Sequence, residues 1–365
     1  MQNLLTALSL SLIYNKRFVI TTNNVETLQQ DFIRIILENS CSVTPDQIQV
    51  IDLLEFTTER NLINQCTIPI GNEEDNEYEF KPYIIWKNLA KVDGQLQRYL
   101  YELITKIDLY DTKESRNNPR PCIIDGYSIR KPDLFIIIAL LDHRSYYLKI
   151  DQYLKSKFWF SNNYVIDKSS SKPDRLTLPM NDFSYHDNIA YLRQLIPNVY
   201  IKPDIKRYIY SLVVHSRNHR LCSLAPRQTR LSTRSIDDIE DLARVMVLWQ
   251  KFNNQNLTDS LYVTPDFVKV AMRKIGYWLI DWEYNKLFSN VNDNDDDNDN
   301  DEEQDEKDYR RRMEISMMTA YWYGSDYKYV TKYLDKSESL RDDSTPTGYS
   351  NVIVEDALKS VRPPI

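Results

Sequence analysis

Residues 16–37 hold a strand, a polar break and a helix in that order, and this unit constrains the fold more than any other stretch. Residues 17–22 contain an apolar, β-branched run, as in a buried strand. Apolar side chains then recur at helical spacing over residues 28–36, and Thr27 is well placed to cap that helix. In α/β proteins that bind nucleotides, the phosphate loop lies between such a strand and helix.

The polar break lacks the chemistry that a phosphate loop needs. Such a loop uses glycines, whose backbone N–H groups close on the phosphates, and a lysine that meets their charge. Residues 23–27 contain neither glycine nor lysine, and Glu26 would repel an anion. The sequence therefore predicts the scaffold of a nucleotide-binding unit without its phosphate contacts.

The net charge and the cysteines limit the class of protein to which the chain can belong. The net charge of −7 is concentrated in residues 293–308, where eleven acidic residues face one lysine, so the remaining chain is close to neutral. With no general basic field, direct binding of nucleic acid is not expected. The four cysteines are scattered without a Cys-x-x-Cys pair, which favours a reducing, intracellular compartment, either nucleus or cytoplasm. Residues 4–14 are apolar but too short to span a bilayer, so we expect a helix leading into the first strand and no membrane association.

Strand-like and helix-like patterns alternate through the first half of the chain. Further strands are predicted at residues 47–51, 81–86, 122–124 and 133–141. Helices are predicted at residues 92–107 and 149–160, and residues 72–79 are interpreted as an acidic surface loop. This alternation predicts an α/β fold, a three-layer core with a mostly parallel sheet and helices on both faces.

From residue 203 the pattern changes to helices alone. They are predicted at residues 205–213, 236–247 and 264–282, the last with Pro265 at its first position. Residues 292–308 are too acidic to bury a core and are expected to be disordered, and the tail from residue 335 is expected to be loosely held. The predicted organisation is a core at 1–199, an all-helical lid at 200–290, an acidic disordered insert at 291–308, and a C-terminal helical segment with a flexible tail at 309–365.

Few residues that could take part in catalysis follow the ends of the predicted strands. An ATPase of this build carries acidic residues after its third strand to hold Mg²⁺, but this chain has Lys87, and Asp93 is placed as a helix N-cap. Asp142, His143 and Arg144 follow the last strand of the core and are a site candidate, with a solvated loop as the alternative. No motif of an ordinary enzyme is present, so no enzymatic activity and no cofactor are expected.

Two clusters near residue 220 are weighed as binding sites. His215, His219 and Cys222 would share a helix face and could ligate zinc, but a fourth ligand is lacking and the helix is expected to end near residue 218, so no metal site is predicted. A possible basic patch for a partner, for phosphate or for nucleic acid consists of Arg217, Arg220, Arg227, Arg230 and Arg234. Its alternative is a solvated helix end and loop.

Taken in order, these pieces resemble the AAA+ ATPases of the MoxR branch. The resemblance covers about residues 1–285, and in the helical region it rests on Ala-Pro-Arg at 225–227 and Tyr-Val-Thr-Pro-Asp-Phe-Val at 262–268. It implies that Arg227 is a retained sensor arginine and a candidate to bind nucleotide. It also implies that residues 23–27 replace the Walker A loop, that residues 86–88 replace the Walker B acids, and that Lys157 falls near the inter-subunit arginine. Loss of both Walker motifs should abolish hydrolysis, so no catalytic residue is assigned.

More narrowly, the chain resembles the fungal maintenance of telomere capping protein 2 family in length, in its inert AAA+-like layout and in its acidic, asparagine-rich insert. That resemblance implies a role in telomere capping, expected to be indirect. We therefore predict a catalytically inactive scaffold that binds an unidentified protein partner. The alternatives are a nucleotide-binding switch without hydrolysis, in which Arg227 holds a phosphate, and weak binding of nucleic acid through the basic patch.

Overall fold

A five-stranded parallel sheet forms the centre of the protein. The structure is a computed structural model that describes residues 2–39, 43–55, 59–70, 77–110, 122–124, 126–142, 150–165, 184–219, 222, 230–256, 260–280 and 342–364. The strands of this sheet are, in spatial order, β2 (Ile48–Asp52), β5 (Tyr83–Lys87), β8 (Ile136–Asp142), β1 (Phe18–Thr22) and β9 (Ser161–Tyr164). Every neighbouring pair is parallel. β1 and β8 are almost continuously buried, as parallel strands are when both faces of the sheet are covered.

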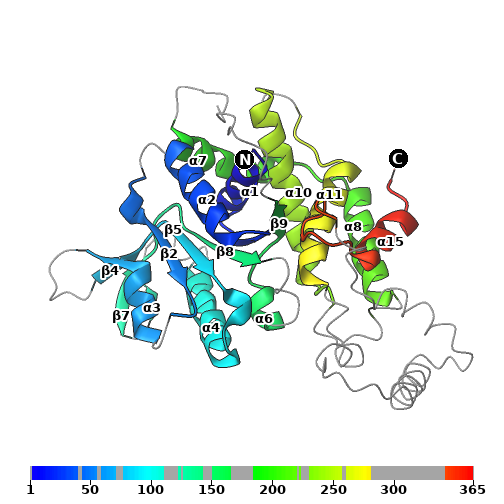
Figure 1. Ribbon diagram of the computed structural model, residues 1–365. Helices are drawn as coiled ribbons and strands as arrows, with labels where there is room; N and C mark the ends of the chain where they lie inside the picture. The colour runs from blue at the N-terminus through cyan, green and yellow to red at the C-terminus, as the bar shows by residue number, and fades with distance from the viewer. Residues whose placement is uncertain are drawn as a thin grey trace, which may run out of the picture.

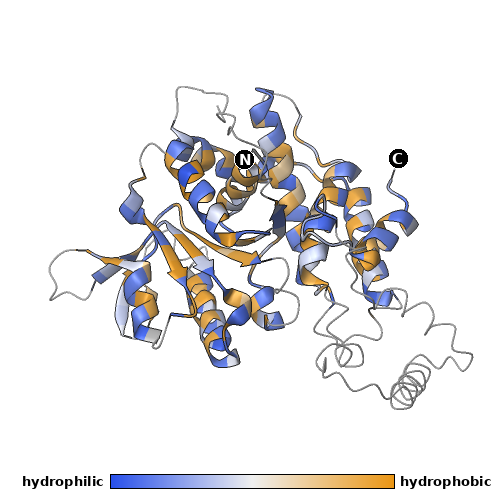
Figure 2. Ribbon diagram, viewed as in Figure 1, coloured by the Kyte–Doolittle hydropathy of each residue, from blue (hydrophilic) through white to orange (hydrophobic). Residues whose placement is uncertain are grey.

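Helices cover both faces of this sheet (Figure 1). On one side lie α1 (Gln2–Tyr14), α2 (Val25–Asn39) and α7 (Tyr185–Leu195), and on the other lie α3 (Glu59–Cys66) and α4 (Gly94–Tyr110). Short 3-10 helices occur at η1 (Pro45–Gln47), η3 (Leu89–Lys91) and η4 (Ile196–Asn198). Figure 2 shows hydrophobic residues concentrated in the strands and on the inner faces of the helices. The predicted three-layer α/β core with a mostly parallel sheet is confirmed.

A second, smaller sheet was not expected from the sequence. Its strands are, in spatial order, β3 (Thr67–Pro69), β4 (Glu77–Phe80), β7 (Tyr127–Arg130) and β6 (Cys122–Ile124). The prediction of a loop over residues 72–79 is therefore wrong for residues 77–79. Backbone pairing with β3 and β7 holds this charged strand in place, and an ion pair between Arg130 and Glu77 at 2.8 Å adds to it.

The helix predicted for residues 149–160 is also largely wrong. Only α6 (Gln152–Lys155) is helical there, and the chain then enters β9. Asp151 is the N-cap of α6, and its side chain accepts hydrogen bonds from the N–H groups of Tyr153 and Leu154. The sequence of β9, Ser-Asn-Asn-Tyr, carries no apolar run, so only its pairing with β1 makes it a strand.

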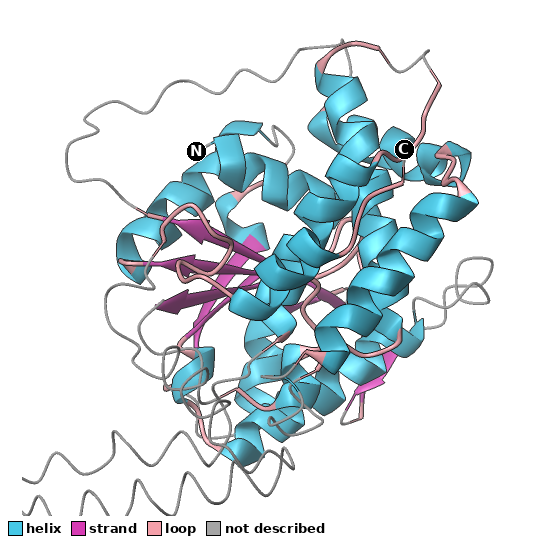
Figure 3. Cartoon of the chain, turned by 90° about the vertical axis from the view of Figure 1, so that its right-hand side faces the viewer, coloured by secondary structure: helices cyan, strands magenta, loops and turns pink. Residues whose placement is uncertain are grey.

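The later region is helical, as predicted, and packs directly on the core (Figure 3). It contains α8 (Pro203–Asn218), α10 (Arg234–Asn253) and α11 (Pro265–Leu279). α10 packs on α1 and α11 packs on β9, so one continuous hydrophobic core runs through both regions. The predicted boundaries at residues 199, 290 and 308 stay predictions. Across the described ranges, no helix combines the length and the apolar character that crossing a membrane requires.

The segment that ends in α15 (Val352–Ser360) is docked on the helical region, which corrects the prediction of a loose tail for residues 342–358. α15 packs against α8 and α11, and its residues Ile353, Val354 and Ala357 are fully buried. A Cβ atom placed on Gly276 of α11 would lie 2.9 Å from Cγ2 of Val354, so the glycine lets the two helices approach. The apolar residues of α15 are few and follow a long polar stretch, so their pattern did not indicate a packed helix.

Polar contacts fix the same helix. The guanidinium of Arg273 donates two hydrogen bonds to the carboxylate of Glu355, at 2.7 and 2.8 Å, and the Tyr277 hydroxyl donates a third at 3.0 Å. The hydrogen bonds from Arg273 hold the pKa of Glu355 below its ordinary value, although partial burial opposes the shift. Asn351 caps α15 and also donates to the Ile280 carbonyl at 3.1 Å.

The close approach of α11 and α15 predicts a strong effect of Gly276→Val. The added side chain must displace Val354, and overpacking of this kind costs about 1–3 kcal/mol. Urea unfolding should show a lower midpoint. The matched control is Gly94→Val at the start of α4, where a Cβ meets nothing within 4 Å. Equal destabilisation by both substitutions would contradict this account of the helix contact.

The Arg273–Glu355 contact predicts a pH-dependent effect of Glu355→Gln. Because the folded-state pKa is lowered, the carboxylate contributes stability above the unfolded-state pKa of about 4.3, and that stability is lost as the pH falls through the folded value. Since both side chains are partly exposed, the substitution should cost only about 1 kcal/mol at pH 7, and less below pH 4. Urea unfolding at several pH values measures this. Glu102→Gln, in an exposed pair with Arg98, is the control, and a Glu355 effect that grows on acidification would refute the prediction.

Candidate functional site

The carboxyl ends of the parallel strands form the edge where ligands bind in open α/β sheets. Thr22 ends β1 and is aligned with Asp142, the last residue of β8. Asp52 ends β2 and is aligned with Lys87, the last residue of β5. This edge therefore gathers the residues that the sequence singled out after the strands. His143 and Arg144, predicted to join Asp142, lie outside the described residues.

The turn between β1 and α2 satisfies its own backbone. The Oδ1 atom of Asn24 accepts a hydrogen bond from the Thr27 N–H at 3.1 Å, and the Asn24 carbonyl accepts one from Leu28. The Thr22 hydroxyl accepts a hydrogen bond from the Asn24 N–H at 3.3 Å. Asn24 thus caps the helix, and the prediction that Thr27 does so is wrong, because α2 already begins at Val25. One of the N–H groups that a phosphate would need is taken by this cap.

The charges of an ion pair at this edge are the reverse of those that a nucleotide site would need. Glu26 lies in the first turn of α2, and its Oε1 atom is 3.1 Å from Nζ of Lys87 at the end of β5. The Lys87 side chain is only 13% exposed, whereas that of Glu26 is 73% exposed. A phosphate site needs positive charge at the helix start, and a magnesium site needs negative charge at the end of β5. Here the two charges are exchanged, and they neutralise each other.

The neighbouring carboxylates have other partners. Asp52 accepts two contacts from Nδ2 of Asn88, at 2.8 and 2.9 Å, and one from the Leu54 N–H at 3.1 Å. Asp93 accepts from the Leu96 N–H at 2.9 Å at the start of α4, which confirms it as a helix cap. Within the described ranges, no group of three possible metal ligands is found.

The cluster of His215, His219 and Cys222 does not continue along one helix, because α8 ends at Asn218 as predicted. Nε2 of His219 lies 3.4 Å from Oδ2 of Asp356 on the C-terminal helix. Cys222 is fully buried, and burial raises the pKa of its thiol to about 11. His219 and Cys222 therefore have places in the packing of the helical region, whereas His215 is exposed on α8.

The basic patch is only partly placed. Arg217 lies on the exposed face of α8, Arg230 is half-buried near Cys222, and Arg234 is the first residue of α10. Arg220 and Arg227 lie outside the described residues, so the candidate nucleotide contact of Arg227 is not located.

Lys157, likened above to an inter-subunit arginine, is engaged within the chain. Its Nζ atom is 3.2 Å from the carboxylate of Asp108 and lies over the Tyr101 ring. Arg17 contacts the same carboxylate. Burial pushes the pKa of Asp108 upward, but the two cations outweigh burial and hold it below its ordinary value. These residues lie near the amino end of β1, at the opposite edge from the Glu26–Lys87 pair.

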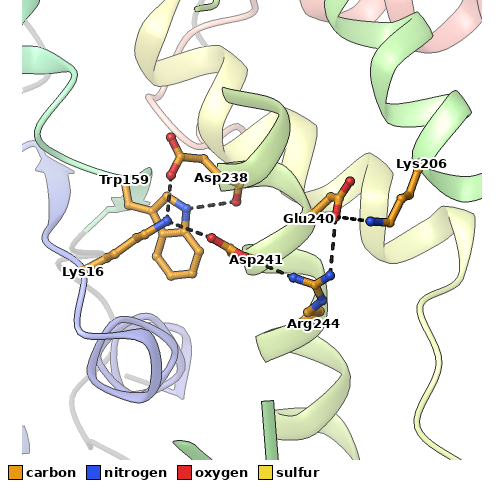
Figure 4. Close-up of polar contacts among 7 residues, drawn as sticks. All are labelled: Lys16, Trp159, Lys206, Asp238, Glu240, Asp241 and Arg244. Atoms are coloured by element: carbon orange, nitrogen blue, oxygen red, sulfur yellow. Dashed lines mark hydrogen bonds and ion pairs between the residues drawn. The ribbon is translucent and has the colours of Figure 1, made fainter. Parts of the chain in front are cut away.

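A second polar cluster joins the core to the helical region, and we call it the seam (Figure 4). Nζ of Lys16 is 2.7 Å from Asp238 and 3.2 Å from Asp241 on α10, and it also lies over the Trp159 ring. The Trp159 ring N–H donates to the Asp238 carbonyl at 3.0 Å. The seam continues through two more residues of α10 and one of α8, namely Glu240, Arg244 and Lys206.

Two further hydrogen bonds join the helical region to the core. The Trp278 ring N–H donates to the Lys155 carbonyl at 3.0 Å. Nζ of Lys274 donates to Oδ1 of Asn162 at 2.8 Å, and burial lowers the pKa of this lysine to about 8. The sequence interpretation missed these residues, although acidic residues at 237, 238, 240 and 241 inside an apolar helix were a signal of buried partners.

These features define the class of protein: a parallel α/β core, joined to a helical region, with an ion pair between Glu26 and Lys87 at the carboxyl edge of its sheet. The chain is similar to proteins named "Maintenance of telomere capping protein 2", which confirms the resemblance found in the sequence. The protein of Vanderwaltozyma polyspora is 26% identical over 73% of this chain and 77% of its own. That of Lachancea thermotolerans is 23% identical over 60% of this chain and 69% of its own. No family model matches the chain.

Two solved structures are similar to this chain over about three quarters of its length. One is named a "putative ATPase" of Cytophaga hutchinsonii, with a TM-score of 0.44 and 13% identity over 75% of this chain and 80% of that chain. Another is an MCM homolog of Methanopyrus kandleri, with a TM-score of 0.42 and 13% identity over 76% of this chain and 55% of that chain.

The seam predicts that Lys16→Met will destabilise the protein. The substitution leaves Asp238 without its cation and leaves Asp241 with Arg244 as its remaining cation, and because both carboxylates are mostly buried we expect a cost of about 2 kcal/mol in urea unfolding. Arg98→Met removes an exposed partner of Glu102 and should change stability by less than about 0.5 kcal/mol. If the two substitutions cost the same, the seam is not a stabilising junction.

Proposed function

We propose that this chain is a catalytically inactive, AAA+-like scaffold that binds a protein partner and acts in telomere capping. The cellular role is taken from the name of the similar proteins. The inactivity is our inference from the carboxyl edge of the sheet. We expect the protein to be intracellular, and we assign no cofactor to it.

The reversed Glu26–Lys87 pair is the observation that carries this proposal. A bound Mg²⁺-nucleotide would have to displace the pair and then place its phosphates beside Glu26 and its metal beside Lys87. Both contacts are repulsive, and the turn has no glycine through which backbone N–H groups could approach. The residues at this edge therefore oppose the charges of the ligand at both of its ends.

The seam supports the scaffold half of the proposal. Enzymes that close on substrate use elements that move between arrangements. Here Lys16, Trp159 and Trp278 tie the helical region to the core by buried or half-buried contacts. A surface built across such a junction keeps one shape, which suits a protein whose work is to present that surface to a partner.

The proposal predicts no response to nucleotide. Thermal unfolding of the full chain should be unchanged by millimolar ATP or ADP, with or without Mg²⁺, whereas a ligand at a hundredfold excess over its Kd would stabilise by about 2.7 kcal/mol. Phosphate release should equal that of an Arg227→Ala control. Hydrolysis above background that is lost in this control would overturn the inactive assignment. Stabilisation without hydrolysis would instead support the nucleotide-binding switch.

The scaffold half has its own test. The full chain and a version without residues 292–308 are purified from cells by affinity, and the retained proteins are compared. Retention of the same specific protein by the full chain in repeated preparations is expected. If neither version retains a protein, the scaffold assignment fails, whatever the nucleotide result.

A further inference from the structure

Two helices of the helical region begin with the same local pattern. The sequence before α8 is Tyr-Ile-Lys-Pro-Asp at 200–204, and that before α11 is Tyr-Val-Thr-Pro-Asp at 262–266. In both, the proline occupies the first helical position and the residue after the tyrosine is buried. The tyrosines themselves are exposed, Tyr200 by 61% and Tyr262 by 55%.

The two tyrosines are neighbours. The Tyr200 N–H donates to the Leu261 carbonyl at 2.9 Å, and the Val263 N–H donates to the Tyr200 carbonyl at 3.1 Å. These bonds make an isolated parallel bridge in which Tyr200 is paired with Tyr262. Because paired residues of a ladder project to the same face, both rings point to solvent on one side. α8 and α11 thus share a start that is marked by two exposed aromatic rings.

The outer face of α8 also carries exposed side chains. Arg207, Tyr210, Val214 and Arg217 are spaced by three and four residues, so they share one face of the helix. Tyr210 is 59% exposed and the side chain of Arg207 is 81% exposed. α10, α11 and α15 pack on the buried face formed around Ile209 and Leu212, and in the described part of the chain this leaves the outer face uncovered.

The charge of this surface is positive in an acidic chain. Residues 202–218 hold Lys202, Arg207 and Arg217 against a single carboxylate, Asp204, and a fourth cation, Lys206, is paired with Glu240 of α10. Asp204 is shared, at 3.1 Å from Lys202 and 3.4 Å from Arg207, so it does not neutralise both. We call the surface the Tyr–Arg face and define it by Tyr200, Lys202, Arg207, Tyr210, Arg217 and Tyr262.

We propose that the Tyr–Arg face binds an acidic peptide segment that also carries apolar side chains and belongs to a partner protein. This inference rests on the proposed scaffold function and names the chemistry of its partner. Tyrosine and arginine are the residues that anchor protein interfaces, and excess cations select carboxylates. The tyrosine rings and Val214 give apolar side chains of the peptide a surface to cover.

A nucleic acid fits this face less well. Single strands are bound by a basic groove that follows successive phosphates. Here Asp204 stands between Lys202 and Arg207 and would repel a phosphate at that point. A peptide can place its carboxylates only where the cations are, so Asp204 does not oppose it.

The test uses the full chain and fluorescence anisotropy. The probe is a labelled peptide of glutamate, leucine and phenylalanine, compared with one in which glutamine replaces glutamate and with a thymidine oligonucleotide of similar length. Binding of the glutamate peptide is expected to weaken about tenfold in Arg207→Glu/Arg217→Glu, and clearly in Tyr210→Ser/Tyr262→Ser. The charge-matched control is Arg98→Glu/Arg130→Glu, two exposed arginines of the core that should leave binding unchanged.

Several outcomes would overturn the proposal. They are absence of peptide binding, equal binding by the face variants, equal binding of the glutamine peptide, and tighter binding of the oligonucleotide that is lost in the face variants. The last result would make the face a nucleic-acid site. If both face variants keep the partners found in the affinity purification, the face is not the binding surface but the scaffold function stands. If no version of the chain retains a partner, the scaffold function itself fails.

Discussion

The position of β1 between β8 and β9 is the constraint on which the rest of the structure depends. All five of its residues are buried, so each backbone group must be paired within the sheet. The carboxyl end of the strand then fixes the turn into α2 beside Lys87. The amino end fixes Lys16 and Arg17, which reach α10 and α4. One strand therefore places the candidate site at one edge of the sheet and the junction with the helical region at the other.

The Glu26–Lys87 pair bears on the chemistry of the candidate site and not on the stability of the fold. Glu26 is largely exposed, so the pair contributes at most about 1 kcal/mol to stability and the fold does not depend on it. The sheet beneath the pair is built from buried apolar residues such as Ile85 and Ile138, whose packing is independent of the charges above them. A fold of this kind tolerates exchange of its edge residues, and its function has to be argued from those residues alone.

The sequence predicted those parts of the fold that carry a periodic apolar signal. β1, β8 and the three long helices of the later region have such a signal, and the lack of glycine and lysine at residues 23–27 can be read directly from the sequence. β9 was missed because its side chains are polar and only the neighbouring strand makes it extended. The seam was missed because Lys16 and Asp238 are 222 residues apart, and pairing over that separation leaves no local pattern. α15 was undervalued because its apolar face is short.

The docking of α15 has a consequence for how such a chain can vary. Residues 281–341 connect two fixed points, the end of α11 and the segment that leads into α15. A premature stop codon within them would delete Ile353 and Val354 from the interior. It would also uncover the parts of α8 and α11 against which α15 packs. Selection on the gene would therefore act against truncation at any point before α15.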